Sequence, residues 1–293
     1  MRRATPAPVA HRTTEIDGVE IFFREAGPPE APVVLLPHGY PCSSFEFRHF
    51  MAALGDRWRL VAPDYPGFGY SATPARSDFA YTFDAYAGFL ARFVDQLVLE
   101  RYAIYLHDYG SQFGLRLALR APERVAALII QNGDIYEDEL GPKYGWLRSY
   151  WENPTDEGRE QMASNVSEEG FREEFLNDVR AELAERISPD LWKLHWSLMT
   201  PERRENVVNL FEDQATTLGW FGREQAYLRE HQPPTLIAWG PQDGYMPEGA
   251  ARAYLRDLPD AELHLLDGGH WALETNLDEV VALARDFLGR VHG

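Results

Sequence analysis

Several acidic and histidine side chains of this 293-residue chain follow short apolar segments, in positions from which they could carry out covalent catalysis. Asp108 ends the apolar segment 102–108, and a glycine two residues later leads into a helical pattern. His270 and Asp243 end two later apolar segments. A carboxylate is already ionised at neutral pH and can attack a saturated carbon directly, whereas a serine must first lose a proton. The residue types therefore suggest a nucleophilic aspartate with a separate histidine base.

The segments that must position these residues alternate between strand and helix patterns. Strands are predicted over 19–27, 32–39, 59–64, 102–108, 125–133, 234–240 and 261–270. Helices are predicted over 43–54, 83–97, 111–122, 247–257 and 275–289. Such alternation predicts an α/β fold, in which a mostly parallel central sheet is flanked by helices on both faces. Ligands of such sheets bind at the carboxyl ends of the strands.

The pattern changes in the middle of the chain. From residue 134 to 228 the predicted strands vanish, and acidic, tryptophan-rich helical segments replace them. We therefore predict a helical cap over 134–228, inserted between two parts of one core, 15–133 and 229–293. Residues 1–14 are expected to form a flexible N-terminal tail.

Polar side chains gather at the predicted strand ends: His38, Asp64, His107, Asp108, Asn132, Asp134, Asp243 and His270. Four motifs occur in order: HGYP (38–41), DYPGFGYS (64–71), LHDYG (106–110) and GHW (269–271). Asp108 stands where the nucleophile-elbow motif G-x-S-x-G has its serine. Together the motifs resemble the α/β-hydrolases, in particular the epoxide hydrolase and haloalkane dehalogenase branch that uses an aspartate nucleophile. The similarity runs from about residue 15 to the end of the chain.

The resemblance implies a role for each candidate residue. Asp108 would form an alkyl ester with the substrate, and His270 would activate the water that hydrolyses it. Asp243 would orient His270, with Asp134 as the alternative acid after the preceding strand. Backbone N–H groups of Tyr40 and Tyr109 would form the oxyanion hole. No metal or cofactor is needed. Taken alone, Asp108 is also a favourable helix N-cap.

The leaving group separates the two reactions of this branch. The resemblance implies that a departing halide is held by indole N–H groups, one of them directly after the nucleophile, where this chain has Tyr109. A departing epoxide oxygen needs a proton donor, which epoxide hydrolases supply with cap tyrosines. Candidates for this role are Tyr136, Tyr144 and Tyr150 in the cap, with Tyr245 or His195 as substitutes. We therefore expect an epoxide hydrolase-like enzyme, with haloalkane dehalogenase as the alternative. A catalytically inactive small-molecule binder is the non-enzyme alternative.

One helical face of the cap is strongly aromatic. Trp192, His195, Trp196 and Met199 recur at i, i+3, i+4 and i+7 and therefore share a face. This face either packs against neighbouring helices or forms the roof of a cavity over Asp108. The second interpretation predicts a bulky or planar hydrophobic substrate.

Composition limits the partners and the compartment. The net charge of −18 makes nucleic acids and anionic membranes unsuitable partners, so a small-molecule substrate is expected. Cys42 is the only cysteine, and no apolar run resembles a signal peptide or a membrane span. A cytoplasmic protein, monomeric or homodimeric, is expected.

Overall fold

The computed structural model describes residues 6–292, and its eight strands form one sheet in the order β1-β2-β4-β3-β5-β6-β7-β8. Their bounds are β1 Val9–Ile16, β2 Val19–Ala26, β3 Val33–Leu35, β4 Arg59–Pro63, β5 Tyr102–His107, β6 Val125–Gln131, β7 Thr235–Trp239 and β8 Glu262–Leu265. The pairs β1–β2 and β2–β4 are antiparallel, and the remaining pairs are parallel. The predicted α/β fold with a mostly parallel sheet is confirmed.

The first strand was not predicted from the sequence. β1 pairs with β2 along its whole length, from Val9 opposite Ala26 to Ile16 opposite Val19. Asp17 and Gly18 close the hairpin with φ angles of 53° and 80°. The expectation of a flexible tail over residues 1–14 was therefore wrong from residue 9 onward, and residues 1–5 lie outside the described part of the chain. An edge strand needs only one partner, so it can have a polar sequence.

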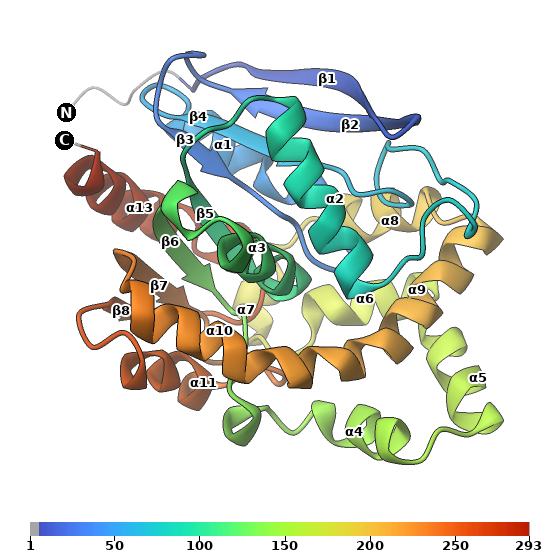
Figure 1. The fold of residues 1–293 in the computed structure, drawn as a ribbon. Coiled ribbons are helices and arrows are strands. Elements are labelled where there is room, and N and C mark those ends of the chain that lie inside the picture. Colours follow the sequence, from blue (N-terminus) through green and yellow to red (C-terminus); the bar gives the residue numbers. More distant parts are fainter. Residues whose placement is uncertain (1–5, 293) are drawn as a thin grey trace.

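Helices cover both faces of the sheet (Figure 1). The helices on one face are α1 Arg48–Leu54, α12 Ala272–Thr275 and α13 Leu277–Val291, and those on the other are α2 Phe83–Gln96, α3 Asp108–Arg120, α10 Leu218–His231 and α11 Glu248–Ala253. Strand side chains point alternately to the two sides. Ile104 and Leu106 pack in the cluster of α2 and α3, whereas Ala103 and Tyr105 pack in the cluster of α1 and α13. Burial on both faces explains why the central strands are apolar throughout.

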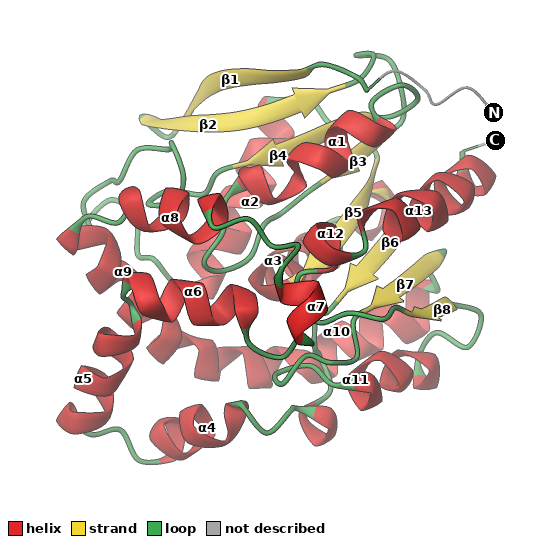
Figure 2. Ribbon diagram, turned by 180° about the vertical axis from the view of Figure 1, so that it is seen from behind, coloured by secondary structure: helices red, strands yellow, loops and turns green. Residues whose placement is uncertain are grey.

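A run of helices separates β6 from β7. Its members are α4 Tyr144–Glu152, α5 Asp156–Asn165, α6 Glu168–Leu176, α7 Ala181–Ala184, α8 Asp190–Ser197, α9 Pro201–Asp213 and α10, with the short 3-10 helices Glu137–Glu139 and Gln214–Thr217. Figure 2 shows most of these helices on the side to which the arrowheads of β5 and β6 point. We call residues 144–231 the helical insertion. The cap boundaries 134 and 228 remain a prediction.

A buried carboxylate at the end of β4 ties the neighbouring loops together. Asp64 is fully buried and accepts hydrogen bonds from the backbone N–H and the hydroxyl of Ser44, at 2.8 and 2.5 Å, and from the N–H of Tyr70 at 2.8 Å. The guanidinium of Arg24 lies 3.9 Å away. Asp64 is therefore a structural member of the strand-end group.

Replacing Asp64 should strongly destabilise the protein. In Asp64→Ala, Arg24 keeps a buried charge without its carboxylate, and such losses cost about 3–5 kcal/mol of unfolding free energy. Urea denaturation measures the change. The exposed carboxylate of Asp260 provides the control, because Asp260→Ala should change stability by less than about 0.5 kcal/mol. Equal stability of the two variants would contradict the assigned role.

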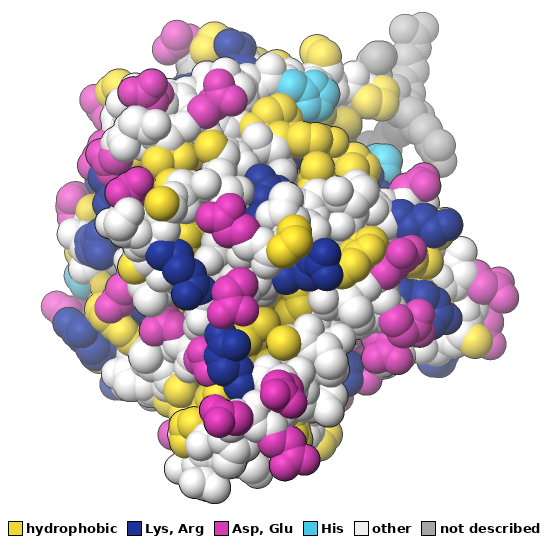
Figure 3. Space-filling model, turned by 90° about the vertical axis from the view of Figure 1, so that its right-hand side faces the viewer, with side chains coloured by type: hydrophobic (Ala, Val, Ile, Leu, Met, Phe, Trp, Pro, Cys, Tyr) yellow, Lys and Arg dark blue, Asp and Glu magenta, His cyan; other side chains and the backbone are white. Residues whose placement is uncertain are grey.

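The surface mixes charges of both signs. Figure 3 shows acidic and basic side chains interspersed with hydrophobic ones on the face at the right of Figure 1. Exposed pairs such as Arg159–Glu205 and Arg172–Glu169 contribute to this mixture. Among residues 6–292, none of the helices combines the length and apolar character needed to cross a bilayer.

Candidate active site

Asp108 stands on a sharp turn between β5 and α3. Its φ of 48° lies in the left-handed region, which disfavours residues other than glycine. Two glycines permit this turn. A Cβ on Gly39 would lie 2.3 Å from Asp108 Oδ1, and one on Gly110 would lie 2.0 Å from the carbonyl oxygen of Pro37. The strand, turn and helix predicted around Asp108 are thus present, and the carboxylate points to the carboxyl end of the sheet.

The two oxygens of Asp108 have different surroundings. Oδ1 accepts a hydrogen bond of 2.7 Å from the backbone N–H of Tyr40, and the backbone N–H of Tyr109 also donates to this carboxylate. Oδ2 lies 3.5 Å from Nε2 of His270. Burial raises the pKa of Asp108, while His270 and the two N–H donors act in the opposite direction. The carboxyl group is therefore held by two backbone donors, and Oδ2 is left on the side of His270.

His270 is held by Asp243 through its other ring nitrogen. The distance from Nδ1 of His270 to Oδ2 of Asp243 is 2.6 Å. The same Oδ2 accepts a hydrogen bond of 2.9 Å from Nδ2 of Asn132. Oδ1 of Asp243 accepts from the backbone N–H groups of Tyr245 and Met246, at 2.8 and 3.1 Å. Four donors thus fix this fully enclosed carboxylate, which in turn fixes the imidazole.

The charges of this group set the protonation of His270. Burial alone would lower its pKa, but the neighbouring carboxylates, first of all Asp243, raise it to about 9. Burial likewise opposes ionisation of Asp243, yet His270 and the hydrogen bonds keep the pKa of Asp243 below its usual value. Asp108 is one of the carboxylates that raise the pKa of His270. Esterification of Asp108 would remove that charge, so His270 would lose its proton more readily when a base is needed.

The backbone of His270 is anchored as well. Its carbonyl oxygen accepts hydrogen bonds from Nε2 of His107, at 3.0 Å, and from the side-chain amide of Gln131, at 2.9 Å. Nδ1 of His107 lies 2.6 Å from Glu46. The strand-end residues before Asp108 and Asn132 thus fix the loop that carries the histidine.

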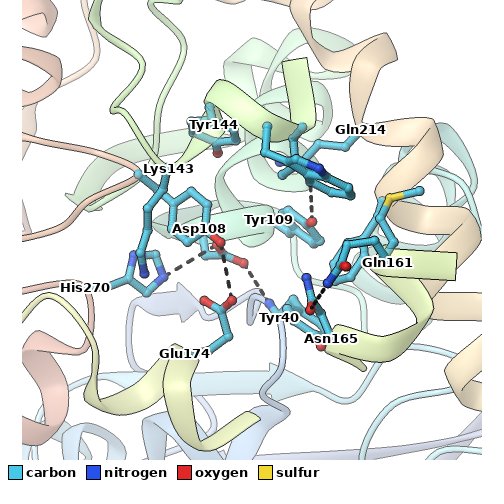
Figure 4. Close-up of a pocket in the computed structure, with 15 residues that line it drawn as sticks. Tyr40, Asp108, Tyr109, Lys143, Tyr144, Gln161, Asn165, Glu174, Gln214 and His270 are labelled. Carbon is cyan, nitrogen blue, oxygen red and sulfur yellow. Dashed lines mark hydrogen bonds and ion pairs between the residues drawn. The ribbon is translucent and has the colours of Figure 1, made fainter. Parts of the chain in front are cut away.

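These residues open onto a cavity of about 490 Å³ between the sheet and the helical insertion (Figure 4). Its lining consists of Tyr40, Asp108, Tyr109, Lys143, Tyr144, Trp146, Leu147, Gln161, Met162, Asn165, Glu174, Phe211, Gln214, Tyr245 and His270. The volume and the mainly apolar and aromatic lining suit a small organic molecule. Within residues 6–292, no group of three or more histidine, cysteine or acidic side chains is arranged to hold a metal ion.

The structure brings only some of the predicted substrate-binding residues to this cavity. Tyr144 and Tyr245 line it, whereas Trp192, His195, Trp196 and Tyr150 are not among the described residues of its lining. His195 is buried, 3.2 Å from the hydroxyl of Ser43, and the hydroxyl of Tyr150 donates to Glu212. The predicted aromatic roof was therefore wrong, because this face of α8 packs inside the protein.

Asp134 does not take the place of Asp243. Its side chain interacts with Tyr144, and burial raises its pKa to about 7. Nδ1 of His270 is already bonded to Asp243. Asn132, two residues before Asp134, donates a hydrogen bond to Asp243 and does not itself bond to Nδ1 of His270.

Sequence reasoning missed five polar residues of the cavity: Lys143, Gln161, Asn165, Glu174 and Gln214. A signal existed for Glu174, because α6 buries Phe171 and Phe175, which lie three residues before and one after it. The same spacing also marks Glu168, three residues before Phe171 and seven before Phe175, so this signal leaves two candidates on α6. Nothing comparable marks Lys143 or Gln214.

Two comparisons with known proteins agree with this geometry. The chain is 32% identical to an uncharacterized hydrolase of Saccharomyces cerevisiae over 289 residues, which cover 95% of each chain. It is 42% identical to haloalkane dehalogenase 2 of Mycobacterium tuberculosis, but over only 101 residues, 34% of this chain and 35% of that one.

Solved structures and a family profile extend the comparison to the whole fold. The haloalkane dehalogenase DatA of Agrobacterium tumefaciens superimposes with a TM-score of 0.80 over 97% of each chain, at 23% identity. The profile of the alpha/beta hydrolase fold matches residues 32–277, which include Asp108, Asp243 and His270. The chain therefore belongs to the α/β-hydrolase fold family.

Proposed function

We propose that this hydrolase converts an epoxide into a diol through a covalent ester on Asp108. The observation that carries the proposal is the set of polar groups that share the cavity with Asp108 and His270. Tyr245 lines this space with its hydroxyl 3.3 Å from Glu174, another lining residue, and the residue after the nucleophile is Tyr109 rather than a tryptophan. Within the described lining the one indole belongs to Trp146, which is 43% exposed and stacks on Tyr150. Hydroxyl donors suit a departing oxygen better than a departing halide.

The first step forms the ester. Oδ2 of Asp108 attacks a ring carbon, the carbon–oxygen bond of the epoxide breaks, and its electron pair stays on the oxygen. That oxygen takes a proton from the hydroxyl of Tyr245 and remains attached to the substrate as an alcohol. Such proton donation typically accelerates a reaction by about 10²–10⁴-fold.

The second step releases the diol. His270 takes a proton from water, and the water oxygen attacks Cγ of Asp108. Negative charge develops on Oδ1, to which the N–H of Tyr40 already donates, and the N–H of Tyr109 donates to the same carboxyl group. When the intermediate collapses, the leaving alkoxide takes the proton from His270, and Asp108 is left as a carboxylic acid that contains the oxygen from water. Return of its proton to the donor that Tyr245 represents restores both groups.

Haloalkane dehalogenation is the second candidate. The 42% identity to haloalkane dehalogenase 2 over about a third of the chain favours it. On this chain, the polar groups beside Asp108 that could face a halide are Tyr109 and Gln214, which are hydrogen-bonded to each other at 2.8 Å. The ester and its hydrolysis would be the same in both reactions.

A matched pair of substrates distinguishes the candidates. Styrene oxide and (2-bromoethyl)benzene carry the same phenylethyl skeleton, so the leaving group is the main difference. We expect diol formation to exceed bromide release by at least about 10²-fold in kcat/KM, which is the lower range for a positioned proton donor. Chromatography of the diol and a bromide assay measure the two rates. Asp108→Ala is the control and should abolish both. Faster bromide release would favour the dehalogenase.

A further inference from the structure

A second carboxyl group faces the same cavity as Asp108, from the opposite side. Glu174 belongs to α6 of the helical insertion, and Figure 4 shows its carboxyl group directed toward the space beside Asp108 and His270. The other glutamates of this helix, Glu168, Glu169 and Glu173, are not part of the described lining. The steps proposed above assign no role to Glu174.

Two hydrogen bonds connect Glu174 to the loops of the catalytic residues. The hydroxyl of Tyr245 lies 3.3 Å from Oε1 of Glu174, and the indole N–H of Trp271 donates to the backbone oxygen of Glu174 at 2.7 Å. Tyr245 follows Asp243 by two residues, and Trp271 follows His270 directly. Glu174 is therefore fixed with respect to the reacting groups.

The surroundings of Glu174 raise its pKa above the usual value of a glutamate. Enclosure in the cavity raises its pKa and Asp108 adds to this, while Lys143, His270 and the Tyr245 hydroxyl oppose it. The ammonium group of Lys143 is itself paired with Asp178 at 2.6 Å. The groups that α5 contributes to the lining, Gln161, Met162 and Asn165, are uncharged. From α8, His195 stacks on Phe175, and burial lowers its pKa to about 4, so it adds no charge.

Tyr245 is a weak acid by itself. Burial raises its pKa well above that of a free phenol, and negative charge on Asp108, or on Glu174 when it is ionised, adds to this shift. If Tyr245 gave its proton to the substrate without replacement, a buried phenolate would remain beside the carboxyl group of Glu174. A protonated carboxyl group bonded to the phenol removes this difficulty, because its proton can replace the one that leaves.

We propose that Glu174 is the proton source for ring opening and that it acts through the hydroxyl of Tyr245. This inference rests on the proposed epoxide hydrolysis and names the group that makes it possible. As Asp108 opens the ring, Tyr245 gives its proton to the epoxide oxygen and takes the proton of Glu174, which becomes a carboxylate. Hydrolysis of the ester regenerates Asp108 as a carboxylic acid, and its proton returns to Glu174. One proton thus cycles between two carboxyl groups on opposite sides of the substrate.

The role of Glu174 predicts a distinctive pH profile. The measurement is the rate of ester formation with styrene oxide in the His270→Gln background, where the imidazole no longer titrates. The rate should rise with pH as Asp108 ionises and fall again as pH rises through the raised pKa of Glu174. With (2-bromoethyl)benzene, whose leaving group needs no proton, any rate should lack the falling limb. If the rate fell at high pH with both substrates, or with neither, the proposal would be overturned. This test needs no substitution of Glu174.

Substitution then assigns the falling limb. Glu174→Gln keeps a hydrogen-bonding side chain of the same shape but has no proton to transfer, so alkylation by styrene oxide should slow by about 10²-fold or more and lose its falling limb. Glu173→Gln, one residue earlier on the exposed side of α6, is the matched control. It should leave the alkylation rate and pH profile of the His270→Gln protein unchanged. Alkylation by the bromide should not slow in Glu174→Gln.

The outcomes separate the two proposals. If styrene oxide alkylates Glu174→Gln as fast as the parent, Glu174 is not the proton source, although epoxide opening stands. If no epoxide forms an ester with the His270→Gln protein, with or without Glu174→Gln, while the bromide does, the proposed function itself fails.

Discussion

In the His270→Gln variant, the reaction is expected to stop at the Asp108 ester, which should accumulate to about one equivalent per protein. Ester formation needs Oδ2 of Asp108 and the proton donor, whereas hydrolysis needs a base beside the ester. Nε2 of His270 lies 3.5 Å from Oδ2 and is the base that the geometry supplies. Glutamine fills much of the same space but cannot take a proton from water. Hydrolysis should slow by at least about 10²–10⁴-fold, the usual contribution of a positioned base.

Intact-protein mass spectrometry identifies the trapped species and its leaving group. An epoxide adds its whole mass to the protein, because the oxygen stays attached, whereas a haloalkane adds its mass less that of the hydrogen halide. The double variant Asp108→Ala/His270→Gln is the control and should carry no adduct. Turnover by the wild type without any trapped ester in His270→Gln would contradict the covalent mechanism. If no compound reacts with either protein, the inactive-binder alternative gains support.

The core of this site could be predicted because the sequence pattern of a parallel sheet fixes it. Asp108 and Asp243 follow buried strands, His270 follows the partly exposed edge strand β8, and parallel strands bring their carboxyl ends to one edge. The sequence order of Asp243 before His270 also pointed to the carboxylate that contacts His270 in the structure. What the sequence could not show was the role of Asn132, whose bond to Asp243 depends on the spacing of two neighbouring strands.

The helical insertion was harder to interpret, because helical periodicity identifies a shared face and not what that face meets. Trp192, His195 and Trp196 do share a face of α8, but it packs into the protein. Glu174 faces the cavity, although its glutamate-rich surroundings resemble a solvated helix. Contacts between elements distant in the chain decide both cases.

The missed first strand had a local signal. Asp17-Gly18 between Ile16 and Val19 is the dipeptide that favours a two-residue hairpin, and both residues have positive φ angles. The polar composition of residues 11–15 hid the strand, since β1 has a neighbour on only one side.

The second large effect is expected from Asp243→Asn, which should slow ester hydrolysis by about 10⁴-fold while leaving ester formation largely intact. The cause is the imidazole tautomer. In the native protein, Nδ1 of His270 donates to Oδ2 of Asp243, so Nε2 is the nitrogen that can accept a proton. An amide N–H at this position would face both Nδ1 and the amide of Asn132, which lies 2.9 Å from Oδ2. The imidazole would then accept at Nδ1 and carry its proton on Nε2, where it cannot act as base.

Asp134→Asn is the matched control for this variant. Both carboxylates are buried, and both follow β6 or β7 at the carboxyl edge of the sheet, but only Asp243 contacts His270. Single-turnover kinetics with an epoxide resolves the two steps: Asp243→Asn should accumulate the ester, and Asp134→Asn should hydrolyse it at close to the wild-type rate. Slow hydrolysis in Asp134→Asn with normal hydrolysis in Asp243→Asn would show that Asp134, and not Asp243, is the acid that orients His270. The two changes make the same replacement of a buried carboxyl by an amide at neighbouring strand ends. With the assay above pH 7, where Asp134 is mostly ionised as well, a difference between them reports on contact with His270 rather than on the net charge of the site.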